Sequence, residues 1–473
     1  MRFLGLILVF LVGTIQTSAE INPTMRLVLL NTGLPLVEIN TVNRVAPTCD
    51  YVSAPEGCWG TGAANKLKVP SRMTIRQGSK LLYDSGDYEE DQSGLTIAIR
   101  GNTSAYTEKK PYKLKLQKKA DLLFRGDDKK YKDKNWLLLK DDRSMSLNTM
   151  IGLKVNELVG MQWTPRFMFV NVLLNDDYRG VYMLSESVRR NPDCRLDVEE
   201  ATGYIMEYDA YWWNEPLSLA EGTFYQYAPM RYTFKYPDAE DMTQEQMAYI
   251  QNAVDQLERS VADGTYPLYV DLESFANWLL AHDILGTSDG GGSNIFLTKR
   301  DSTAASKFEM ANLWDFDTIE RTPGLWSSIH YLWGWYFKWM LESENHSFAD
   351  VFYSRWEQLS ATLVDDMNAF LDDFATSPEA VALDNALLLD GKRWQYENTT
   401  VDADVEAAKV WFAERKEWID QQVEMEKAAV SIVPVRTTAA KSSKQRYDLW
   451  GRRYHARSTF YVESGKKYFS LQK

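Results

Sequence analysis

The hydrophobic periodicity of the chain changes once, near Thr243. Before this residue, apolar and polar residues alternate in short stretches such as "GLTIAIRG" (94–101) and "KKPYKLKL" (109–116). A period of two is typical of β-strands. After it, apolar residues such as Met247 and Ile250 recur every three or four positions, which is the spacing of one helix face. The sequence therefore predicts an α+β fold with a β-rich first half and a helix-rich second half.

Shorter patterns predict the elements of the first half. "LPLVEINTV" (34–42) is typical of a strand, and "APTCDYVSAPEGCWGTGAAN" (46–65) of a turn-rich loop. "FMFVNVLL" (167–174) and "GVYMLSE" (180–186) flank a polar turn, which is the pattern of a β-hairpin. One early helix is expected from "SLNTMIGLKVNELVG" (146–160), which ends on a glycine.

The second half opens with clear helix signals. Thr243 and Gln246 form the sequence pattern of a capping box, and a second helix is expected from about Asp271. "NIFLTK" and "KFEMANLWDFD" predict a pair of strands. The remaining expectations are a charged loop over 117–135, mostly helix over 345–427, and a tail over 432–473 that closes as short strands.

The N-terminal sequence predicts export. Arg2, a short apolar run and Thr17-Ser18-Ala19 are typical of a secretory signal peptide cleaved after Ala19. The apolar run is too short for a membrane-spanning helix, and no later segment is long and apolar enough, so no transmembrane anchor is expected. We predict an exported protein of the periplasm, cell surface or extracellular space.

Charge and cysteine content narrow the classes of partner and site. The formal net charge of −13 disfavours binding to nucleic acid. In an exported protein Cys49 and Cys58 can form a disulfide that leaves Cys194 unpaired, and the sequence leaves this pairing open. The four histidines have no zinc-binding spacing.

A cluster of acidic and amide side chains marks the start of the second half. Asp289 precedes three glycines and Asn294, and Asp315 and Asp317 follow in "WDFD". Carboxylate and amide oxygens are ligands that suit Mg²⁺. Asp and Asn in a glycine-rich loop are also ordinary turn formers, and an Asp pair also suits a solvated strand end. If "WDFD" is extended, Asp315 and Asp317 point to the same side.

Two lysines of the first half suit phosphate binding. Lys113 and Lys115 alternate with apolar residues on one predicted strand, as does the strand lysine of protein kinases. Exposed lysines on an edge strand are the ordinary alternative. The sequence has no GxxxxGK[ST] loop and no GxSxG elbow, which excludes a P-loop nucleotide enzyme and argues against an α/β-hydrolase.

Several of these segments occur together in an order that resembles a known family. "IRGNTSAYTEKKPYKLKL", "NWLLLKDDRSMSLNTMIGLKVNEL", "FVNVLLNDDYRGVYMLSESV", "GYIMEYD", "DGGGSNIFLTKR" and "LWDFDTIE" follow one another as in the CotH family, which is named for a bacterial spore-coat protein. The resemblance covers roughly residues 35–425. It implies a two-lobed fold similar to protein kinases and an atypical Ser/Thr protein kinase that uses ATP and Mg²⁺.

The resemblance also implies roles for individual residues. Asp289 resembles the catalytic aspartate, and Lys115 the lysine that holds ATP phosphates, with Lys113 as the second choice. The other positions of the family pattern are Arg100, Asn102 and Ser104 near the phosphates, the acidic Glu186 and Glu207, and the metal ligands Asn294, Asp315 and Asp317. The implied partners are a nucleotide and an unidentified protein substrate.

The resemblance suggests a domain layout and leaves one functional alternative open. We expect a signal peptide over 1–19, a lead-in over 20–34 and a kinase-like domain over 35–425 whose lobes meet near residue 190. A linker with a β tail, which resembles a sorting segment, is expected over 426–473. The alternative is a non-catalytic, pseudokinase-like surface or coat assembly or binding protein. Export supports this alternative because ATP is scarce outside the cytoplasm. The many tryptophans and exposed acids alone suggest a third option, a carbohydrate-active protein.

Overall fold

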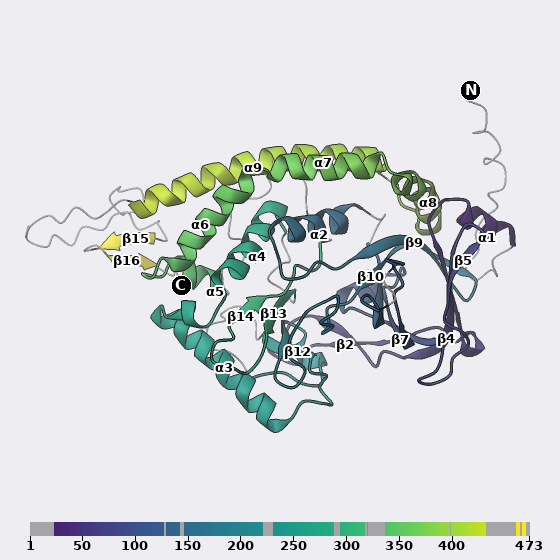
Figure 1. Cartoon of the computed structure of the whole chain (residues 1–473), viewed down its shortest axis with the longest axis horizontal. Helices are drawn as coiled ribbons and strands as arrows, with labels where there is room; N and C mark the ends of the chain where they lie inside the picture. Colours follow the sequence, from purple (N-terminus) through teal and green to yellow (C-terminus); the bar gives the residue numbers. More distant parts are fainter. Residues whose placement is uncertain are drawn as a thin grey trace, which may run out of the picture. The chain divides into compact units, whose positions relative to one another are not determined.

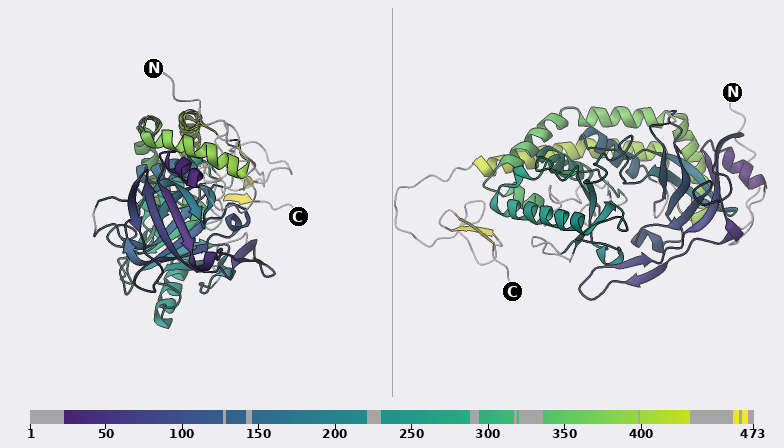
Figure 2. Two further views of the ribbon diagram at one scale, coloured as in Figure 1. Left: turned by 90° about the vertical axis from the view of Figure 1, so that its right-hand side faces the viewer. Right: turned by 60° about the horizontal axis from the view of Figure 1, so that its bottom comes forward.

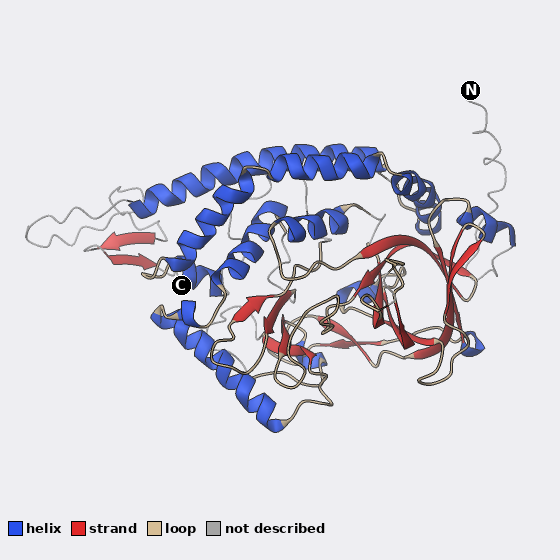
Figure 3. Ribbon diagram, in the orientation of Figure 1, coloured by secondary structure: helices blue, strands red, loops and turns tan. Residues whose placement is uncertain are grey.

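The computed structural model describes residues 23–126, 129–141, 146–220, 230–287, 294–316, 319, 336–397, 399–431, 460–463 and 466–469. Contacts within the chain separate two units, a first that ends at Ile419 and a second from Asp420 to Lys473. In the first unit, strands dominate the N-terminal half and helices the C-terminal half (Figure 3). The predicted α+β class is confirmed at this level.

A closed barrel of seven strands forms most of the β-rich half. The hydrogen-bonded order is β1-β9-β10-β8-β7-β6-β4, and β4 pairs back with β1 to close the barrel. β5 extends the sheet from β4, and the left view of Figure 2 looks onto these strands. Their bounds are β1 Leu36–Thr41, β4 Val69–Gln77, β5 Lys80–Asp84, β6 Leu95–Ile99, β7 Tyr112–Ala120, β8 Asp133–Leu139, β9 Phe167–Leu174 and β10 Asp177–Glu186.

The alternation read from the sequence explains the core of the barrel. In β7, Tyr112, Leu114 and Leu116 are buried, while Lys113 and Lys115 lie on the outer face. Side chains of this kind from the neighbouring strands form one apolar cluster that includes the fully buried Trp136. Closure leaves no free edge along the ring of strands, which removes sites for unwanted strand pairing.

Two predictions of irregular structure in the first half are wrong in part. Residues 46–65 contain a hairpin of β2 (Asp50–Ser53) and β3 (Thr61–Ala64), and Cys49 and Cys58 beside it are not bonded to each other. Residues 117–135, expected as a loop, contain the end of β7 and the start of β8. Short elements of this half are α1 (Pro23–Leu30), the 3-10 turns η1 (Val42–Arg44) and η2 (Thr103–Tyr106), and α2 (Asn148–Leu158).

A second sheet follows the barrel. Its order is β12 (Arg231–Tyr236), β11 (Tyr204–Asp209), β13 (Ile295–Lys299) and β14 (Phe308–Met310), all antiparallel. The predicted pair "NIFLTK" and "KFEMANLWDFD" corresponds to β13 and β14, although the strand ends at Met310, before "WDFD". The 3-10 turn η3 (Trp212–Asn214) follows β11.

Helices complete the first unit. Their bounds are α3 Gln244–Asp263, η4 Tyr266–Leu268, α4 Leu272–Leu285, α5 Tyr336–Leu341, α6 Ser347–Ser360, α7 Leu363–Ala375, α8 Pro378–Trp394 and α9 Val401–Ser431, the last of which ends in the second unit. The predicted capping box is present, since Thr243 Oγ1 accepts from Gln246 N at 3.1 Å. In the second unit, β15 (Phe460–Glu463) and β16 (Lys466–Phe469) form the predicted short strands.

α8 connects the helices to the barrel. Figure 1 shows α8 between α7 and the barrel strands. The Nζ of Lys109 lies 2.8 Å from Oδ1 of Asp390 on α8, and both side chains are fully buried. The same oxygen accepts from the backbone N–H of Val181 on β10, at 2.8 Å. Gly180 permits this approach, because a Cβ there would lie 2.0 Å from Oδ1 of Asp390. In the part of the chain that is described, no helix is long and apolar enough to cross a membrane.

Candidate functional site

The two candidate lysines both lie on the outer face of β7, but they differ in burial. Lys115 is exposed, whereas Lys113 is half-buried. Burial, together with the nearby charges of Arg189 and Lys235, lowers the pKa of Lys113 to about 8. Lys68 acts in the same direction, and Asp238 opposes it. Lys113 therefore lies among cations that repel one another, an environment that an anionic ligand would stabilise.

Arg100 of the barrel interacts electrostatically with the second sheet and with the segment that follows it. It follows β6 directly, and β6 pairs with β7 so that Ala98 lies opposite Lys113. Burial lowers the pKa of Arg100, and this effect is opposed by the carboxylates of Asp315 and Glu207. One guanidinium from the barrel thus faces two acidic residues that the sequence places far downstream.

Glu207 is a buried carboxylate near Arg100. It lies on β11 and pairs with Lys235 on β12, with 2.5 Å between Oε2 and Nζ. Burial raises the pKa of Glu207 to about 7, although Lys235 favours its charged form. Burial alone would lower the pKa of Lys235, but Glu207, Glu215 and Asp209 together raise it. The region therefore combines cations and carboxylates in a partly desolvated space.

No sequence motif predicted three cationic residues of this region. Lys66 lies before β4, Arg189 follows β10, and Lys235 is on β12, so no motif groups them. Burial lowers the pKa of Lys66 against the opposing effect of Glu215, and the charges of Arg100 and Lys235 lower it further. Only the tertiary structure brings these lysines and arginines together.

The acidic and amide candidates fall at one end of the second sheet. Asn294 is buried and directly precedes β13, where Ile295 pairs with Tyr208 on β11. Asp315 follows β14 and is exposed. Asp315 has a φ of 64°, in the left-handed region, so the extended geometry expected for "WDFD" is wrong at this residue. Asp289 and Asp317 lie outside the described residues.

The oxygen donors that are described suit a hard cation without completing a site for it. Asn294 supplies an amide oxygen and Asp315 a carboxylate, the ligand types that Mg²⁺ prefers. Within the described ranges, no three His, Cys, Asp or Glu side chains are grouped closely enough to hold a metal ion. A magnesium site at this end of the sheet would therefore also depend on residues outside these ranges.

Helix α2 holds the segment that carries Asp315. The ring of Phe316 is buried and packs on Gly152 of α2, where a Cβ would lie 2.1 Å from Cδ1 of the ring. At one end of the segment, Asn156 Oδ1 accepts from the backbone N–H of Leu313 at 2.7 Å. At the other end, Nδ2 of Asn148 donates to the carbonyl of Ile319 at 3.2 Å. A glycine within a helix was the only sequence signal for this packing.

The "RGNTS" loop contacts η3 and Tyr211, which directly precedes η3. Nδ2 of Asn214 on η3 lies 3.4 Å from Oδ1 of Asn102, and the hydroxyls of Thr103 and Tyr211 are 3.0 Å apart. Ser104 is half-buried, and its carbonyl accepts from a nearby hydroxyl. The β2–β3 hairpin lies against the same elements, because a Cβ on Gly62 would lie 2.9 Å from Nδ2 of Asn214. Asn102 and Ser104 thus lie at this junction, two and four residues after Arg100.

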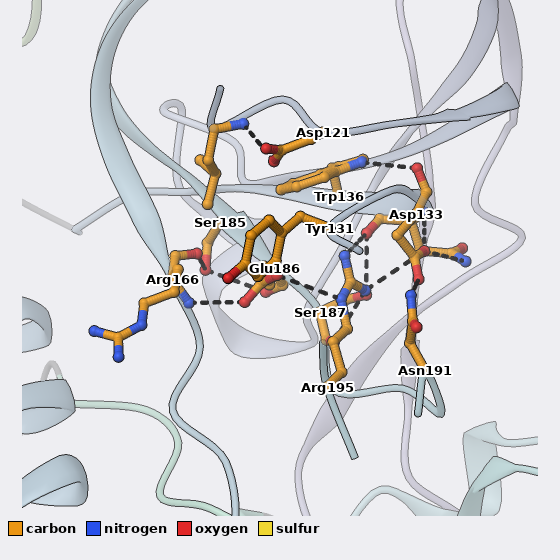
Figure 4. Close-up of polar contacts among 12 residues, drawn as sticks. Asp121, Tyr131, Asp133, Trp136, Arg166, Ser185, Glu186, Ser187, Asn191 and Arg195 are labelled. Atoms are coloured by element: carbon orange, nitrogen blue, oxygen red, sulfur yellow. Dashed lines mark hydrogen bonds and ion pairs between the residues drawn. The ribbon is translucent and has the colours of Figure 1, made fainter. Parts of the chain in front are cut away.

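Glu186 belongs to a different group of side chains. It is fully buried at the end of β10, where Figure 4 shows its polar contacts. Oε1 of Glu186 lies 2.9 Å from Arg125 and 3.8 Å from Arg195, and Oε2 accepts from the backbone N–H of Arg166 at 3.0 Å. Arg195 also lies 3.5 Å from Asp133. The structure places Glu186 in this buried network, at the point where the chain leaves the barrel.

Comparison with protein-family models identifies the family of this chain. Residues 97–419 match the family model described as CotH kinase protein. The matched span contains Arg100, Lys113, Glu207, Asn294 and Asp315, and it ends where the first unit ends. A search of curated proteins finds no match to the chain.

Proposed function

Because this chain belongs to the CotH kinase family, we propose that it is an exported atypical Ser/Thr protein kinase. It transfers the γ-phosphoryl group of ATP to a hydroxyl group of a protein substrate. The observation that carries this proposal is the position of Arg100, which follows β6 of the barrel, near the carboxylates of Glu207 and Asp315. Lys113 lies on the neighbouring strand β7, beside the cation Lys235. Cations that hold phosphate and carboxylates that hold metal are the parts that phosphoryl transfer needs.

Each described residue has a physical task in this proposal. Lys113 and Arg100 bind the phosphate oxygens. The negative charge of the phosphates offsets the repulsion among the cations of this region. Asn294 and Asp315, with Asp317, would hold Mg²⁺, which when bound offsets negative charge on the phosphate oxygens. Phe316 packs on α2 and so orients Asp315. Glu207 holds Lys235 beside Lys113.

Asp289 completes the reaction. Its carboxylate accepts the proton of the substrate hydroxyl as the oxygen bonds to the γ-phosphorus, and ADP leaves with the electron pair of the broken P–O bond. Binding and proton transfer therefore depend on different residues, and substitutions can separate the two.

Two lysines of one strand provide a matched test. We expect Lys113→Ala to lower phosphoryl transfer from labelled ATP by about 100-fold, because it removes a desolvated cation at the phosphates. Lys115→Ala, two residues along on the same face but exposed, should keep activity within about twofold. Equal losses in both variants would contradict the assignment of Lys113.

A second measurement separates a kinase from a non-catalytic binding protein. Asp289→Asn should keep the upward shift of the melting temperature with Mg·ATP while phosphoryl transfer is lost, because only the proton acceptor changes. A wild-type protein that shows neither a shift nor transfer at millimolar nucleotide would instead support the surface or coat assembly function.

A further inference from the structure

A polar pocket lies on the outer wall of the barrel, in a part of the chain that the family match does not cover. Its volume is about 520 Å³, and its lining includes Arg26 of α1 and side chains from β1 and β4. All lining residues precede residue 80, whereas the family match begins at residue 97. The pocket therefore shares no residue with the site described above.

Strand pairing builds the floor of the pocket. β1 and β4 are antiparallel, with Glu38 opposite Thr74 and Asn40 opposite Arg72. Side chains alternate along each strand, so these four point outward while their neighbours fill the barrel core. Arg76, two residues after Thr74, extends the same outer row of β4. Among the described residues, the charged groups of the lining are three arginines and Glu38. Asp84, Asp87 and Asp176, which lie outside the lining, also pair with two of these arginines.

Two of the arginines are held in place by carboxylates. Glu38 is buried, and its Oε1 accepts from Nε of Arg26 at 2.6 Å. Asp84 binds Arg72 through Nε at 3.1 Å and Nη2 at 2.6 Å. Arginines that are already oriented lose less side-chain entropy when they bind a ligand. The pocket is therefore preorganised before any ligand enters.

The guanidinium of Arg76 is less engaged by carboxylates than those of Arg26 and Arg72. In the described part of the chain, its closest ion-pair contact is 3.9 Å, to Oε2 of Glu38. Its side chain is 38% exposed, which leaves the planar guanidinium accessible from the pocket. A guanidinium binds carboxylate or phosphate oxygens through two parallel hydrogen bonds. Asn40 and Thr74 beside it can pair with hydroxyl groups.

We propose that this pocket binds a small polyhydroxylated acid, a sugar unit that carries one carboxylate or phosphate group. The anionic group pairs with Arg76, because Asp84 and Asp87 already bind the three nitrogens of Arg72. The hydroxyl groups pair with Asn40 and Thr74. The volume lies within the range of about 300–1,000 Å³ that is common for small-molecule sites. Arg76, whose ion-pair contact with Glu38 is 3.9 Å long, selects acids over neutral sugars.

The test uses the full chain and three probes in isothermal titration calorimetry: glucuronate, glucose 6-phosphate and neutral glucose. We expect saturable binding of at least one acid and none of glucose, and which acid binds distinguishes carboxylate from phosphate. Arg76→Ala should weaken binding about tenfold, because one charge-assisted contact is lost. Arg76→Lys keeps the positive charge but loses the planar pair of N–H donors. Its affinity for the acid should therefore lie between the affinities of wild type and Arg76→Ala.

Two further variants test the electrostatic reasoning. Glu38→Gln should tighten acid binding, because it removes a negative charge 3.9 Å from Arg76. The amide oxygen of the new side chain can still accept from Arg26, so the orientation of that arginine is kept. Arg166→Ala is the matched control, since Arg166 is an exposed arginine outside the pocket that pairs with Glu157. Its affinity for the acid should equal that of wild type, and saturating Mg·ATP should not displace the acid.

Several results would overturn the proposal. Absence of saturable binding of both acids at millimolar concentration would do so. Equal affinity of wild type and Arg76→Ala would place the binding elsewhere, and displacement by Mg·ATP would place it at the nucleotide site. Binding of glucose as strong as that of glucuronate would show that charge does not select the ligand. None of these outcomes depends on kinase activity.

Discussion

Substitution of Gly152 by alanine tests the packing that positions Asp315. In an exposed helix interior, Gly→Ala stabilises a protein by about 0.5–1 kcal/mol, because alanine loses less backbone entropy on folding. At Gly152 the new Cβ would lie 2.1 Å from Cδ1 of Phe316, far inside contact distance. The ring is buried, so it cannot move into solvent. Overpacking of this kind costs about 1–3 kcal/mol.

The expected net effect of Gly152→Ala is a loss of stability of about 1 kcal/mol, opposite in sign to the helix propensity. Urea denaturation measures this value as a change in midpoint at constant slope. Because Asp315 precedes Phe316, displacement of the ring should also weaken Mg²⁺-dependent nucleotide binding, which calorimetry measures on the folded protein.

A double-mutant cycle isolates the contact. In a Phe316→Ala background the ring is absent, so Gly152→Ala should become stabilising, with a coupling free energy of about 2 kcal/mol between the two positions. If Gly152→Ala changes the free energy of unfolding equally in both backgrounds, the contact has no energetic role. If stability falls while nucleotide binding is unchanged, α2 does not position Asp315.

Three other predictions concern single groups. Nucleotide affinity should fall as pH rises through about 8, because the Lys113 ammonium, whose pKa is lowered to about 8, loses its proton there. Binding titrations from neutral to alkaline pH measure this step, and they should show no such step in Lys113→Ala. Lys109→Met should cost about 3–5 kcal/mol in urea denaturation, because it leaves Asp390 buried and unpaired, and adding Asp390→Asn should recover part of that loss. Thr243→Ala should lower the free energy of unfolding by about 1 kcal/mol, because α3 loses its capping box, and an unchanged denaturation midpoint would refute this.

The sequence predicted the local structure of this protein well, because local structure depends on periodicity and on a few terminal residues. Alternation identified β6, β7 and the β9–β10 hairpin, and the capping box at Thr243 identified the start of α3. The order of separated motifs predicted the family, which the match over residues 97–419 confirms. The pattern in β7 also placed Lys113 and Lys115 on the outer face.

Tertiary structure decided which partners these elements have. Hydrophobic periodicity predicts that one face of an element is buried, but it does not predict which distant segment packs against that face. Closure of the barrel by β1 and β4, and the packing of Phe316 on Gly152, depend on contacts between segments far apart in the sequence. Lys113 and Lys115 have the same sequence pattern, and only the neighbouring elements bury one of them among cations and leave the other in solvent. The side-chain environment that sets a pKa is a property of the folded chain, because burial and nearby charges are both produced by folding.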